Sequence, residues 1–163
     1  MKQDNIANTL INLSNKEINL YQKVKKLYVA PTSFNNQFIL NNIYIQYQDI
    51  HAEYVVLANK SIEALKRAVF LQWYAVTEPS YLTGISRLNK NAKQKSIIEL
   101  KKQIKTVPEK ELRYMLNYYL LWDYVFTSLT KSDVNQVSIP NMNTNNRGQM
   151  GIYWNSILKQ KII

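Results

Sequence analysis

Apolar residues recur at three- and four-residue intervals along much of the chain, which is the spacing of amphipathic helices. The first run predicts a helix over residues 4–28, and Glu17 interrupts the middle of its apolar seam. This apolar seam is compatible with a coiled coil, in which the helix would pair with a second copy and form a homo-oligomer. It is also compatible with the first helix of a bundle, which is the interpretation we favour. A second apolar stripe predicts a helix over residues 35–58.

Two further helices follow. Ser61 or Asn59 is expected to cap a helix over residues 62–77, which Pro79 ends because the residue before a proline avoids helical geometry. Gly84 is expected to supply a turn with positive φ. Residues 91–106 predict the next helix, with an apolar inner face and a lysine-rich outer face.

Residues 112–129 are apolar or aromatic on nearly every side of a helix and therefore predict the central helix of the fold. Asp123 lies away from the polar strip of this helix, where a carboxylate needs a cation, hydrogen-bond donors or a water-lined cleft.

The composition changes after Thr130. Residues 131–151 are rich in Asn, Ser and Gln and predict an irregular connection. Residues 152–163 resume an amphipathic pattern, which could dock on the bundle, bind a partner or lie on a membrane surface. We therefore expect an all-α, single-domain helical bundle of about five main helices in residues 1–130, followed by the connection and a C-terminal helix that docks on the bundle or on a partner.

The charge of +10 favours association with anions, although an AT-rich genome would also enrich Lys, Asn and Ile. Four lysines on the outer face of the 91–106 helix could follow a phosphate backbone or only solvate the surface. These are Lys95, Lys101, Lys102 and Lys105.

Catalytic motifs are not evident. The chain has three glycines, one histidine and no cysteine, which excludes a glycine-rich nucleotide loop and a cysteine-ligated metal. We expect no cofactor and no metal. No apolar run is long enough for a transmembrane segment, and the cysteine-free composition is compatible with the cytoplasm.

One set of polar residues could converge inside the aromatic-rich bundle and form a small-ligand or enzymatic pocket. The candidates are His51, Glu78 and Asp123, with Arg67, Arg87 and Arg113 as counter-charges. If they do not converge, each is a separately satisfied structural group.

The leading functional interpretation is a non-catalytic binding or adaptor protein that acts through protein–protein contacts. The alternative is a nucleic-acid-binding protein that uses the basic helix face. An enzymatic pocket ranks third, and neither the partner nor the pathway follows from the sequence.

Overall fold

The computed structural model describes residues 3–27 and 34–161, and this part of the chain is helical without strands. Its helices, in chain order, are α1 (Gln3–Leu27), α2 (Phe34–Leu57), α3 (Ile62–Thr77), α4 (Ser80–Thr83), α5 (Lys90–Thr106), α6 (Lys110–Tyr119) and α7 (Gly148–Gln160). The all-α class is therefore confirmed. None of the described helices is long and apolar enough to cross a membrane.

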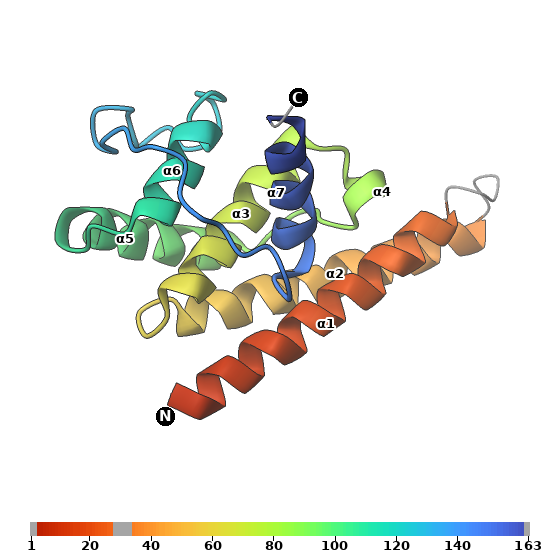
Figure 1. The fold of residues 1–163 in the computed structure, drawn as a ribbon. Coiled ribbons are helices and arrows are strands. Elements are labelled where there is room, and N and C mark those ends of the chain that lie inside the picture. Colours follow the sequence, from red (N-terminus) through yellow and green to blue (C-terminus); the bar gives the residue numbers. More distant parts are fainter. Residues whose placement is uncertain (1–2, 28–33, 162–163) are drawn as a thin grey trace.

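The centre of the fold is α3. All of residues 64–73 on this helix are buried, whereas α1 and α2 each keep an exposed face. Figure 1 shows α1 and α2 running alongside each other beneath α3, with α5 and α6 on one side of it and α7 on the other. The central position that the sequence suggests for residues 112–129 thus belongs to α3.

The ends of α3 follow from local sequence, as expected. Ser61 caps the helix, because its Oγ atom accepts a hydrogen bond from the amide of Ala64, 3.2 Å away. Glu78 ends it in an extended conformation before Pro79. Gly84 has a φ of 78°, and a Cβ atom there would lie 2.7 Å from Cγ2 of Ile43. Only glycine fits this turn.

The prediction of one helix over residues 112–129 is wrong. The helix α6 ends at Tyr119, and residues 120–128 form consecutive turns and bends. Residues 122–128 read Trp-Asp-Tyr-Val-Phe-Thr-Ser and contain no strong helix former, so the apolar pattern alone does not extend the helix. Asp123 is exposed on these turns and needs no buried counter-charge.

The C-terminal helix docks on the bundle. It begins at Gly148, four residues before the predicted boundary, and packs against α1 and α3. Met150 and Trp154 are buried in the core. The apolar seam of α1 packs into the core of the same chain, where Leu13, Leu20 and Val24 are buried.

Candidate functional site

The six residues of the predicted pocket lie at separate places in the structure. His51 and Arg67 are buried on α2 and α3, Arg113 is half-buried on α6, and Glu78 is half-buried at the end of α3. Arg87 and Asp123 are exposed in connections. Among the described residues, no hydrogen bond or ion pair joins any two of the six, so the structure does not bring them together.

His51 belongs to a small buried network. Its Nε2 atom lies 3.0 Å from the side-chain nitrogen of Gln72, which also bonds the hydroxyl of Ser96. Within the described chain, Nδ1 of His51 has no hydrogen-bond partner. Burial, with a smaller contribution from the charge of Lys93, lowers the pKa of His51 from 6.5 to about 4. The imidazole is therefore neutral at physiological pH.

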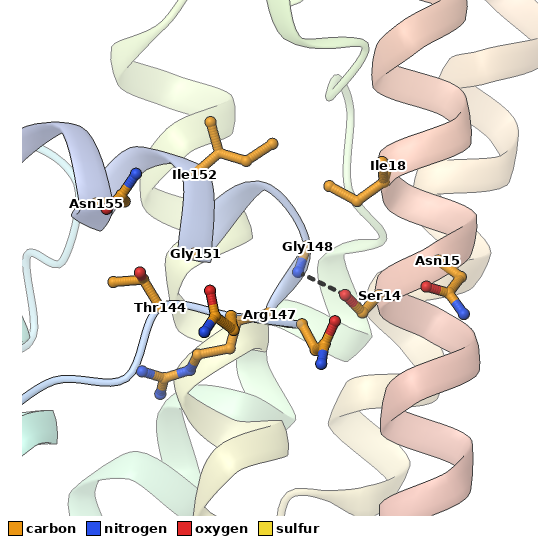
Figure 2. A pocket seen from close by; sticks show the side chains of 11 residues that line it. Ser14, Asn15, Ile18, Thr144, Arg147, Gly148, Gly151, Ile152 and Asn155 are labelled. Atoms are coloured by element: carbon orange, nitrogen blue, oxygen red, sulfur yellow. Dashed lines mark hydrogen bonds between the residues drawn. The ribbon is translucent and has the colours of Figure 1, made fainter.

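A larger polar cluster gathers around the start of α7, which we call the α7 clasp. It comprises Ser14, Glu17, Tyr47, Tyr54, Glu63, Lys66, Arg67, Glu109, Glu111, Arg147, Gly148 and Gln149. The amide of Gly148 donates to Oγ of Ser14 over 2.9 Å, as Figure 2 shows. The amide of Gln149 donates to Oε1 of Glu17 over 3.3 Å, so side chains of α1 satisfy the first turn of α7.

Glu17 is 1% exposed, and its carboxylate is held from two sides. The hydroxyl of Tyr54 donates to Oε2 of Glu17 over 2.7 Å. The side-chain amide of Gln149 donates to the hydroxyl of Tyr47 and to the carbonyl of Thr83, over 2.5 and 2.7 Å. These bonds tie α7 to α1, α2 and the end of α4.

The ion pairs of the clasp extend it to α3 and α6. Arg147 pairs with Glu63 (2.5 Å) and with Glu111. Arg67 pairs with Glu63 over 2.8 Å and donates to the carbonyls of Leu10 and Asn146. Lys66 lies 2.7 Å from Glu109 and 3.1 Å from Glu111. Each buried cation therefore faces at least one carboxylate.

The pKa values of two carboxylates in the clasp, Glu17 and Glu63, are shifted in opposite directions. Burial raises the pKa of Glu17 from 4.5 to about 7, although the bonds from Tyr54 and Gln149 and the charge of Arg67 oppose the shift. Burial also disfavours the ionised form of Glu63, but hydrogen bonds and charge from Arg147 and Arg67 outweigh it and lower the pKa of Glu63.

A pocket of about 380 Å³ adjoins the clasp between α1 and α7. Its walls include the side chains of Asn15, Ile18 and Asn155, while the side chain of Arg147 extends away from Ser14 (Figure 2). Arg147 is the one ionisable side chain among the described residues that line this pocket, and it is already paired. The clasp is built to hold α7 rather than to present a free acid or base.

A second hollow, which we call the α5 groove, lies between α5 and the turns that follow α6. It has a volume of about 560 Å³, and both elements supply apolar and polar wall residues. The walls include Lys90, Lys93, Ile97, Ile98, Val125 and Phe126. Of the four lysines predicted to form a basic face, Lys95, Lys102 and Lys105 are exposed on α5 and Lys101 is half-exposed.

Sequence reasoning missed most of this arrangement. Glu17 was recognisable as a carboxylate in an apolar seam, but its partners are Tyr54 on α2 and Gln149 on α7, which lies more than 130 residues away. Within the described residues, no group of three or more His, Cys, Asp or Glu side chains could hold a metal ion. No protein-family model matches the chain, and neither the curated proteins nor the solved structures include a match.

Proposed function

We propose that the chain is a non-catalytic binding or adaptor protein whose partner is another protein. The observation that carries this proposal is the large apolar side chains on α5 and on the turns after α6. Ile98 is 69% exposed, Leu121 is 61% exposed and Tyr124 is 58% exposed. Aromatic and aliphatic side chains of this size are the usual anchors of protein interfaces.

The arrangement of ionisable groups supports binding rather than catalysis. The cations and carboxylates of the α7 clasp are engaged with one another, and Glu17 is sealed beneath α7. A catalytic acid or base needs to reach a substrate. Among the described residues, no hydrogen bond or ion pair joins the candidates of the predicted pocket to one another.

Nucleic-acid binding is the second candidate, and the exposed lysines of α5 favour it. Lys95, Lys102 and Lys105 are exposed, and Lys102 lies 3.9 Å from the largely buried carboxylate of Glu99. Such side chains attract phosphates. Ile98 and the adjoining apolar turns favour the protein partner, because phosphate and sugar groups do not gain from apolar contacts.

The proposal keeps the expected location in the cytoplasm. The chain has no cysteine, so it has no disulfide that a reducing compartment could break.

Affinity capture from the native lysate, with and without nuclease, tests the function. Tagged wild-type protein should retain a discrete protein after nuclease treatment, and Leu121→Asp combined with Tyr124→Asp should release it. Val56→Asp is the matched control, because Val56 is 74% exposed and belongs to α2 rather than to α5 or the turns after α6. Retention of nucleic acid alone, or release by the control variant, would contradict the proposal.

A further inference from the structure

The α5 groove combines apolar and basic side chains in its walls. Ile97 and Ile98 of α5 face the groove from one element, and Val125 and Phe126 reach it from the turns after α6. Lys90 and Lys93 line it from the same helix. We propose that this groove binds an acidic segment of a protein partner, with an apolar side chain of that segment inside it and flanking carboxylates on the lysines.

This inference rests on the proposed function and names the chemistry of the partner. The apolar walls provide the first argument. Ile98 remains largely exposed, while Phe126, which also lines the groove, is buried. Covering such surface yields about 25 cal/mol for each Å² of apolar area removed from water. An apolar side chain is therefore the group that gains most from entering.

The side-chain nitrogen of Gln72, in the wall of the groove, already has hydrogen-bond partners. Gln72 lines the groove, and its side-chain nitrogen is already bonded to Ser96 and lies 3.0 Å from Nε2 of His51. These contacts fix Gln72 from α2 and α5. An apolar group can thus cover it without leaving this nitrogen unpaired.

The charge around the groove selects an anion. The helix α5 carries six lysines, and its one carboxylate, Glu99, is bonded to the side chain of Gln103 over 2.6 Å. Among the described residues that line the groove, none is acidic. Lys90, Lys93 and Lys95 are exposed, so their charges are available to carboxylates of a partner.

The shape and chemistry favour a polypeptide over the other anionic surfaces. A bilayer is a broad surface, whereas this groove has a volume of about 560 Å³, which suits a short segment of chain. A nucleic-acid backbone would satisfy the lysines but would leave the apolar walls unused. A peptide supplies both an apolar side chain and carboxylates in one short segment.

Selection of short random peptides displayed on phage against the wild-type protein tests the inference directly. We expect the enriched sequences to combine Asp or Glu with a Leu, Ile, Phe or Trp residue. Enrichment of neutral or basic sequences, or no enrichment, would overturn the inference. Equal affinity of the protein for a single-stranded oligonucleotide or for phosphatidylserine vesicles would overturn it as well.

Fluorescence anisotropy of one enriched peptide then locates the site. Lys90→Glu with Lys93→Glu should weaken binding by about tenfold or more, and Ile98→Asp should do the same, where tenfold corresponds to 1.4 kcal/mol. Lys23→Glu with Lys25→Glu on α1 is the matched control and should leave the affinity unchanged. Equal losses in both lysine pairs would show only general charge attraction and would reject the site.

The two proposals fail in different ways. If the captured protein is released by the Leu121→Asp and Tyr124→Asp variant but not by Lys90→Glu with Lys93→Glu, the binding function stands and the acidic partner is rejected. If neither variant releases it, both proposals are rejected. Release by both variants, together with acidic apolar peptides from the selection, supports both.

Discussion

Gly148 lies directly against the buried carboxylate of Glu17. A Cβ atom at position 148 would overlap Oε2 of Glu17, and the φ of Gly148 is 58°, in the left-handed region. The first turn of α7 can approach α1 this closely only because residue 148 has no side chain. Helix docking and the burial of Glu17 therefore depend on the same glycine.

Replacement of this glycine should be costly. We expect Gly148→Ala to lower the free energy of unfolding by about 2–5 kcal/mol, from left-handed strain of about 1–2 kcal/mol and overpacking of about 1–3 kcal/mol. Urea denaturation measures the change. Ser156→Ala, at an exposed position of α7, is the control and should have little effect. Equal stabilities of the two variants would show that α1 and α7 separate without cost.

The proton on Glu17 should make stability depend on pH. Its pKa is about 7 in the folded chain and 4.5 ordinarily, so the folded state holds the proton more tightly. This contribution is complete below about pH 4.5 and is lost as the pH rises through about 7. Glu17→Gln should remove that loss, because the amide stays neutral. Urea midpoints at about pH 5 and about pH 8 test this, and parallel profiles of the two proteins would contradict it.

His51 should show the opposite dependence. Its pKa falls from 6.5 to about 4 on folding, so its contribution is complete above about pH 6.5 and is lost as the pH falls through about 4. His51 is the single histidine of the chain, so NMR of its ring protons gives one titration curve without assignment. We expect a midpoint near pH 4 in the folded protein. A midpoint near 6.5 would mean that the ring is hydrated.

Trp154 should anchor α7 in the core. It is 1% exposed, contacts the rings of Tyr118 and Tyr119, and donates from Nε1 to the hydroxyl of Tyr119 over 3.0 Å. We expect Trp154→Ala to lower the free energy of unfolding by about 3–5 kcal/mol, as for other buried aromatic residues. Ile152→Ala, on the exposed side of α7, is the control for loss of helix propensity. Similar effects of both changes would place Trp154 outside the core.

The sequence predicts the helices best where local signals agree with the apolar pattern. Ser61 and Pro79 bound a periodic run, and α3 begins and ends at the predicted residues. Residues 112–129 have the apolar pattern without a stop signal, and there the prediction fails at Tyr119. The aromatic and β-branched residues that follow have low helix propensity, and their exposure could not be read from periodicity.

The candidate sites depend on long-range packing and were less accessible to sequence reasoning. Glu17 is conspicuous in an apolar seam, but nothing near it in the sequence indicates Tyr54, Gly148 or Gln149 as its neighbours. Arg147 lies in a segment that resembles an irregular connection, although it is buried against Glu63 and Glu111. Such pairings are set by tertiary structure rather than by spacing.

The docking of α7 on α1 also determines when the domain can be completed during synthesis. The hydrogen bond from Gly148 to Ser14 spans 134 positions of the chain, so α1 leaves the ribosome long before the residues that cover it. Contacts of this separation form late, because a long loop must close before they are made. Until then the Glu17 side of α1 stays hydrated and accessible to chaperones, and the finished core appears only once α7 has been translated.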